Sequence, residues 1–231
     1  MWNGKKKAVT FSFDDGVTQD IRLVEILNKY GLKGTFNINS GLLGLPGALQ
    51  RDWGKVNHTK VKASEVKSLY AGHEVAVHSL THPTLVGLDE ETVIRQVEED
   101  RKALEQLCGY PIVGMAYPNG PNDDFVAGVI EKNTPIRYSR TTTSTHSFKV
   151  QKENLLRYNP TVYYKEDCLE QMIDEFLASE SDEDQLLYIW GHSYELDDKN
   201  VAIDWEIFER LCQKLAGKED IFYGTNKEVL L

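Results

Sequence analysis

The stretch Ala8-Val9-Thr10-Phe11-Ser12-Phe13-Asp14-Asp15-Gly16 joins an apolar run to two adjacent carboxylates and a glycine. The run predicts a buried β-strand, and Gly16 lets the backbone turn sharply after it. Adjacent residues at a strand end point in different directions, so one of Asp14 and Asp15 can ligate while the other stays free. The stretch therefore predicts two carboxylates with separate roles at the edge of a sheet.

A second motif, His78-Ser79-Leu80-Thr81-His82, lies at the end of another apolar run. Its spacing places both imidazoles on one side of a helical turn or a tight loop. Two histidines and one aspartate suit a zinc-like ion and leave open positions, which is typical of catalytic sites. An Asp-Asp-Gly turn or a histidine pair alone is more often structural. Their joint occurrence at two strand ends favours a metal centre.

Strand-like and helix-like stretches alternate along the chain, which is typical of β/α units around a mainly parallel sheet. We expect further strands at Gly34 to Ile38, Glu74 to His78, Ile112 to Tyr117, Ile136 to Ser139, Leu186 to Trp190 and Ile221 to Tyr223, and helices at Thr18 to Tyr30, Asp89 to Cys108, Asp167 to Leu177 and Asp204 to Leu215. The segment from Gly41 to Lys60 interrupts this alternation and is expected to be a loop on the side of the site. The chemical residues follow strands, where β/α barrels place their sites.

Composition fits one enzyme domain over residues 1–231, because 231 residues with 41% hydrophobic content can bury a sizeable core. The net charge of -10 argues against nucleic acid and anionic membranes as partners. No apolar run approaches the roughly 18 residues of a membrane span. The three cysteines, Cys108, Cys168 and Cys212, are expected to be core residues without disulfides. With no recognisable signal peptide, these features predict a cytoplasmic location.

The motifs resemble those of the polysaccharide deacetylases of the NodB-homology type, the family four carbohydrate esterases. That family normally carries Thr-Phe-Asp-Asp-Gly and His-Ser/Thr-x-x-His, matched here by Ser12 to Gly16 and by His78 to His82. Weaker matches are Met115 to Gly120, in place of Arg-x-Pro-Tyr, and Ile189 to His192. The resemblance spans almost the whole chain and implies a distorted β/α barrel of about seven strands, of the glycoside hydrolase/deacetylase type.

The resemblance also implies a metal-dependent hydrolase that removes N-acetyl groups from an amino sugar, an oligosaccharide or a polysaccharide. Zinc is the expected ion, with cobalt, nickel and iron as alternatives. The implied roles are Asp14 as general base, Asp15, His78 and His82 as metal ligands, His192 as general acid, and the backbone N–H of Tyr117 as an oxyanion donor.

Two departures from the family pattern indicate a divergent branch. Ala116 occupies the position of the arginine that steers the base, and Arg140 could replace it from the next strand, or else be a surface residue. The aspartate that pairs with the acid histidine also lacks a counterpart. Glu195 is the expected substitute, ahead of Asp197 and Asp198.

Aromatic and polar residues near the motifs are candidates for the substrate site. Trp190 and Tyr194 flank the acid histidine and could shape an acyl pocket. Trp53 could stack on a sugar ring or simply pin its long loop. Asn119 and Glu195 complete the expected substrate-binding set. Of the remaining histidines, His146 is a possible substrate contact, and His58 has no partner identifiable from the sequence.

Three functions remain open: deacetylation of an amino sugar, hydrolysis of a small cyclic amide or ureide by an allantoinase-like enzyme, and carbohydrate binding with weakened catalysis. The expected partner is a carbohydrate or a small acylated amine. Retention of Asp14 beside three ligands argues against the binding-only function, since a binding module needs no free base beside a metal.

Overall fold

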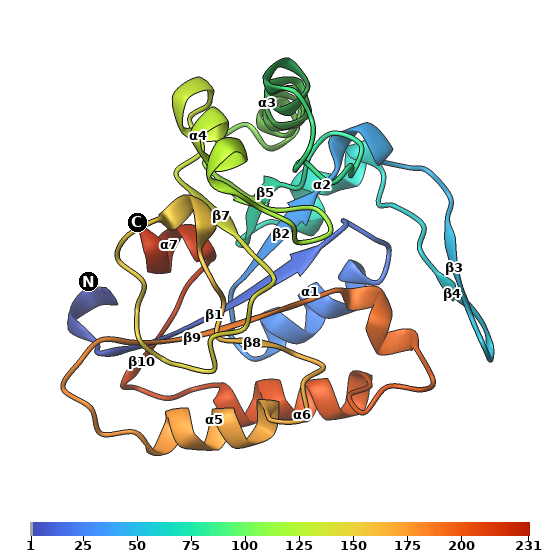
Figure 1. Ribbon diagram of the computed structural model, residues 1–231. Helices are drawn as coiled ribbons and strands as arrows, with labels where there is room; N and C mark the ends of the chain where they lie inside the picture. Colours follow the sequence, from blue (N-terminus) through green and yellow to red (C-terminus); the bar gives the residue numbers. More distant parts are fainter. Residues whose placement is uncertain (1) are drawn as a thin grey trace.

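The computed structural model describes residues 2–231, in which eight parallel strands form one sheet (Figure 1). Seven of them follow the order β7-β6-β5-β2-β1-β9-β8. The eighth, β10, pairs with the first half of β1, and β2 pairs with the second half of β1 along the same edge. The strands are β1 (Lys7–Asp14), β2 (Gly34–Ile38), β5 (Glu74–Val77), β6 (Gly114–Ala116), β7 (Tyr138–Arg140), β8 (Val162–Tyr163), β9 (Gln185–Gly191) and β10 (Ile221–Tyr223). Within residues 2–231 no ladder joins β7 to β8, so the predicted barrel is an open half-barrel.

Helices cover the outside of this curved sheet. They are α1 (Asp20–Lys29), α2 (Ala63–Leu69), α3 (Glu90–Cys108), α4 (Asp124–Asn133), α5 (Leu169–Ala178), α6 (Trp205–Leu215) and α7 (Asn226–Leu230), with short 3₁₀ turns at Trp2–Gly4, Ser40–Leu42, Leu155–Arg157 and Ser193–Asp197. In Figure 1, α3 and α4 lie above the sheet and α5 and α6 below it. Asp89 and Asp204 cap α3 and α6 by accepting bonds from backbone N–H groups three residues on, as expected of acidic helix starts.

Strand β1 is buried along its whole length, and its two faces differ. Val9, Phe11 and Phe13 pack in the large core cluster, whereas Ala8 packs in a smaller cluster with two aromatic residues of β9. Because side chains alternate along a strand, Asp14 lies on the face of Ala8, inside the half-barrel. The strand pattern thus directs Asp14 inward at the carboxyl end of the sheet.

The alternation of strands and helices is confirmed, with shifts of one or two residues at most element ends. The expectation of an irregular loop from Gly41 to Lys60 is wrong in part, because this segment contains an antiparallel hairpin of β3 (Ala48–Arg51) and β4 (Gly54–Asn57). Both strands are largely exposed and polar, so they give no apolar periodicity to detect. The short helices α2, α4 and α7 were not predicted.

None of the helices within residues 2–231 is both long and apolar enough to cross a membrane. All three cysteines have free thiols; Cys108 and Cys212 are buried, and Cys168 is half-buried. The cytoplasmic location and the single domain stay predictions.

Candidate active site

The carboxyl ends of β1, β5 and β9 surround a cavity of about 290 Å³. Ten side chains line it: Asp14, Asp15, His78, His82, Tyr117, Asn119, Thr142, Trp190, His192 and Tyr194. Both sequence motifs and the late histidine therefore meet in one place, although they lie far apart in the chain. This is the carboxyl edge of a parallel sheet, where the sequence places the site.

Asp14 is almost fully buried and has a defined partner on each carboxylate oxygen. Oδ1 accepts a hydrogen bond of 2.8 Å from the side-chain amide of Asn37 on β2. Oδ2 pairs with the Arg140 guanidinium and lies 3.9 Å from Nε2 of both His78 and His192. Burial raises the pKa of Asp14, but Arg140 and the two histidines outweigh it and hold this pKa below its ordinary value. Asp14 is therefore a carboxylate at neutral pH.

Arg140 is fully buried, which resolves the choice left open by the sequence between a surface arginine and a partner for Asp14. One guanidinium nitrogen donates to the Thr141 carbonyl over 3.0 Å, another contacts Asp14, and the group lies 4.3 Å from the centre of the Trp190 ring. Strand β7 thus brings an arginine to Asp14, whereas β6 carries Ala116.

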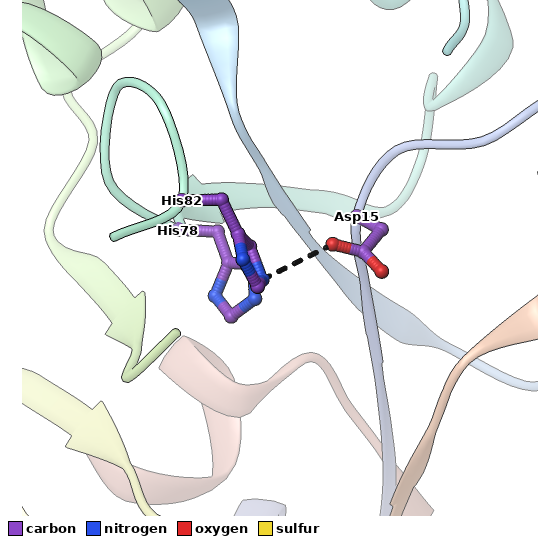
Figure 2. A group of neighbouring side chains, drawn as sticks. All are labelled: Asp15, His78 and His82. Carbon is purple, nitrogen blue, oxygen red and sulfur yellow. Dashed lines mark ion pairs between the residues drawn. The ribbon is translucent and has the colours of Figure 1, made fainter. Parts of the chain in front are cut away.

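Asp15 turns away from Asp14 because its backbone is left-handed, with φ of 84°, and Gly16 follows with φ of 60°. Its Oδ1 lies 3.4 Å from His82 Nε2, and Figure 2 shows both histidine rings facing this carboxylate. Suitable ligand atoms of Asp15, His78 and His82 all lie within 4.8 Å of one another. The first two residues are buried and the third is half-buried.

A neighbouring strand orients the imidazole ring of His78. Its Nδ1 lies 2.8 Å from the Ala116 carbonyl, so that nitrogen carries the proton and Nε2 keeps its lone pair toward the cavity. Burial lowers the pKa of His78 to about 4, and burial also lowers the pKa of His82. Neutral imidazoles and an ionised carboxylate, oriented by outer hydrogen bonds, are the donor set of a divalent transition metal. The three residues fit such an ion.

His58 and Lys60 also reach Asp15, and sequence reasoning missed both. His58 Nε2 lies 3.2 Å from Asp15 Oδ2, while Lys60 Nζ lies 3.4 Å from Oδ1 and donates to the Asp15 backbone carbonyl. Burial raises the pKa of Asp15, but these contacts hold it well below its usual range. The β3–β4 hairpin brings these side chains back to the sheet. No partner for His58 could be identified from the sequence because the hairpin was not predicted.

His192 follows β9 and faces Asp14 across the cavity. Its Nδ1 lies 3.2 Å from Glu195 Oε2, and Glu195 in turn accepts from the Tyr163 hydroxyl. Burial opposes charging of His192, but Glu195 and the two aspartates raise its pKa above the ordinary value. Glu195 therefore occupies the place expected for the missing aspartate, behind the imidazole rather than on the cavity wall.

The structure supports some of the remaining predicted site residues and not others. The backbone N–H of Tyr117 donates to the Arg140 carbonyl over 3.0 Å within the sheet. This amide is therefore not free for an oxyanion, which contradicts the predicted role. Trp53 is absent from the cavity wall, because its indole N–H donates to Asp198 over 2.7 Å and pins the hairpin. Trp190, Tyr194 and Asn119 do line the cavity.

The chain matches a family model, curated proteins and solved structures. Residues 2–136 match the family model described as polysaccharide deacetylase. A peptidoglycan-N-acetylglucosamine deacetylase, PgdA of Listeria monocytogenes, is 27% identical over 124 residues, which cover 52% of this chain. The chain spans only 23% of the length of that relative.

Two solved structures share the fold at low identity. A Mycobacterium smegmatis protein assigned to the polysaccharide deacetylases superposes with a TM-score of 0.67 at 18% identity, covering 98% of this chain and 90% of the other. A Bacillus anthracis pseudoenzyme of the CE4 family, BA3943, superposes with a TM-score of 0.55 at 17% identity, covering 98% and 66%.

Proposed function

Because the chain belongs to the polysaccharide deacetylase family, we propose that it hydrolyses the N-acetyl amide of an amino sugar, alone or within an oligosaccharide or polysaccharide. The observation that carries this proposal is the arrangement of Asp14 and His192, which face one another 3.9 Å apart beside the Asp15, His78 and His82 cluster. An ionised carboxylate and an imidazole with a raised pKa form a complementary base and acid pair.

Asp15, His78 and His82 would hold the divalent ion, most consistent with zinc, and cobalt, nickel or iron would also suit these donors. When bound, the ion would supply Lewis-acid activation of the acyl carbonyl and of water. Asp14 accepts the proton of the attacking water at Oδ2, while Arg140 and Asn37 hold the carboxylate in place.

His192 then donates its proton to the amine nitrogen as the carbon–nitrogen bond breaks. Acetate and a free amine leave the cavity, Asp14 gives up the proton that it accepted, His192 takes one up again, and water enters for the next turnover. Glu195 supports this role because its carboxylate contacts Nδ1 and keeps Nε2 toward the cavity. Positioned acid–base groups of this kind contribute about 10²- to 10⁴-fold each.

The size of the cavity favours a second candidate, hydrolysis of a small cyclic amide or ureide. A volume of about 290 Å³ lies at the lower end of small-molecule sites. The β3–β4 hairpin is tied to the segment after His192, because Arg51 and Trp53 both donate to Asp198.

A substrate panel separates these functions. Metal-reconstituted protein is incubated with N-acetylglucosamine, chitooligosaccharides and a cyclic ureide, and acetate and ureide are quantified. Acetate release supports the deacetylase, and ureide loss supports the second candidate. Sugar binding without any product would show a binding-only protein. The Asp15→Ala variant, which should lose the metal, is the control for adventitious activity.

A further inference from the structure

A second cluster of metal-ligating side chains lies outside the cavity, where the segment after β7 meets the turn after β8. It consists of His146, Glu166 and Cys168, whose ligand atoms lie within 4.8 Å of one another. None of the three lines the cavity. The expected contact of His146 with substrate therefore has no support, and its ring faces Glu166 instead.

We infer that His146, Glu166 and Cys168 form a second site for a divalent transition metal of the zinc class. The donors are one imidazole nitrogen, one carboxylate oxygen and one sulfur, a mixed set that suits zinc or cobalt rather than magnesium or calcium. Three protein ligands leave a fourth position for water. This inference is independent of the proposed deacetylase activity, because it uses none of the residues of the cavity.

Glu166 is oriented as a ligand before any ion arrives. Its Oε1 accepts from the Ser144 hydroxyl and, over 3.0 Å, from the backbone N–H of Tyr163. Its Oε2 is left for His146 Nε2 and lies 4.0 Å from Cys168 Sγ. Outer hydrogen bonds that fix a ligating carboxylate are a regular feature of metal sites.

His146 is held in place by its backbone as well as by its ring. Its φ is 49°, a left-handed conformation that is rare outside glycine, and its N–H donates to the Thr161 carbonyl over 3.0 Å. The backbone at His146 is thus held in an unfavourable conformation that directs the imidazole toward Glu166.

Cys168 distinguishes this site from an ordinary histidine–glutamate pair. A thiol 4.0 Å from a carboxylate oxygen adds little as a hydrogen-bond donor, but it is well placed as a third ligand. Among the cysteines it is the one not buried, so it is accessible to an ion from solvent. Binding would displace the thiol proton to solvent and form a metal–sulfur bond.

Cobalt titration tests the site, because cobalt bound to a thiolate absorbs in the near ultraviolet and cobalt bound only to nitrogen and oxygen lacks that charge-transfer band. The full chain, kept reduced, is titrated with Co²⁺ as wild type and as His78→Ala, which removes a ligand of the cavity cluster. Both proteins should develop the band. It should saturate at about one equivalent of cobalt in His78→Ala, and at up to about two equivalents in wild type, where the cavity cluster also takes up cobalt. The band should disappear in Cys168→Ser and remain in Cys108→Ser, a matched change at a buried cysteine.

The two other ligands provide a second measurement. Glu166→Gln and His146→Gln retain the thiol but each removes a direct ligand. Each should weaken the cobalt affinity measured from the band by more than the roughly 10- to 100-fold typical of changes to outer hydrogen-bond partners. Absence of the band from wild type at saturating cobalt, or its persistence in Cys168→Ser, would overturn the inference. Circular dichroism melting of each variant verifies that the chain is folded.

Discussion

Replacing Arg140 by methionine tests whether this arginine from β7 does the work of the one missing from β6. The Arg140→Met change keeps an unbranched apolar side chain but removes the guanidinium, and with it the charge and the contact with the Trp190 ring. The Asp14 carboxylate, 2% exposed, would then keep only Asn37 and His192 as close polar partners beside the neutral His78. We expect a folded but much less stable protein.

The magnitude follows from the burial of both partners. Removing one member of a buried ion pair costs about 3–5 kcal/mol because the remaining charge loses its compensation. We expect the lower end, about 3 kcal/mol, because Asn37 still donates to Asp14 over 2.8 Å. Domains of this kind are typically stable by about 5–15 kcal/mol, so the variant should still fold. The Asp14→Asn/Arg140→Met double variant should recover about 2 kcal/mol relative to the sum of the single changes.

The pH dependence of this stability difference provides an independent test, because its direction can be predicted. In wild type the lowered pKa of Asp14 gives stability that is present above the unfolded pKa, near 3.8, and is lost as pH falls through the folded value. Without Arg140, burial dominates and raises the pKa of Asp14. The difference in stability between wild type and variant should therefore shrink as pH falls from 7 toward 4.

Urea denaturation followed by tryptophan fluorescence measures these free energies at each pH. Loss of less than about 1 kcal/mol in Arg140→Met would be typical of an exposed pair and would refute the reasoning. Strict additivity in the double variant would refute it equally, since it would mean that the two side chains do not interact.

Three further changes test other parts of the site. Glu195→Gln should lower the pKa of His192, so the alkaline limb of kcat/KM, where the acid loses its proton, should move to lower pH. His58→Ala should weaken metal affinity by about 10- to 100-fold, measured by competition with a chelating dye, because it removes a partner that orients Asp15. Gly191→Ala should cost about 1–3 kcal/mol in urea denaturation, since a Cβ would lie 2.0 Å from a tyrosine ring carbon.

Each of these predictions has a matched control. Glu206→Gln, at an exposed position of α6, should leave the pH profile unchanged, and an unshifted limb in the Glu195 variant would contradict its role. His58→Gln retains a donor and should restore part of the metal affinity, whereas equal affinity in wild type and His58→Ala would exclude the contact. Gly128→Ala, where nothing lies within 4 Å, should not destabilise helix α4.

The sequence was sufficient for those parts of the fold that depend on apolar periodicity. Buried strands such as β1 and β9 and amphipathic helices such as α3 were predicted within a few residues. The β3–β4 hairpin was missed because its residues are polar and exposed, and its pairing depends on contacts with the rest of the molecule.

In the site, residues tied to local motifs were easier to predict than residues that act across the sheet. Asp15, His78 and His82 follow strand ends and converge as expected. Asn37, by contrast, reaches Asp14 only because β2 pairs in register with β1, and no local pattern marks it. The prediction for Tyr117 was wrong for a similar reason, because its backbone N–H donates to the Arg140 carbonyl of β7 and no local pattern indicates this bond.

Acetate release by wild type and Asp14→Asn, compared at equal metal content, tests the central claim most directly. Metal content is measured on the same samples, with an N-acetylated chitooligosaccharide as substrate. We predict that wild type releases acetate and that Asp14→Asn keeps its metal but is slower by about 10²- to 10⁴-fold, because it lacks the base. Equal rates in the two proteins, or no acetate from fully metallated wild type, would contradict the account.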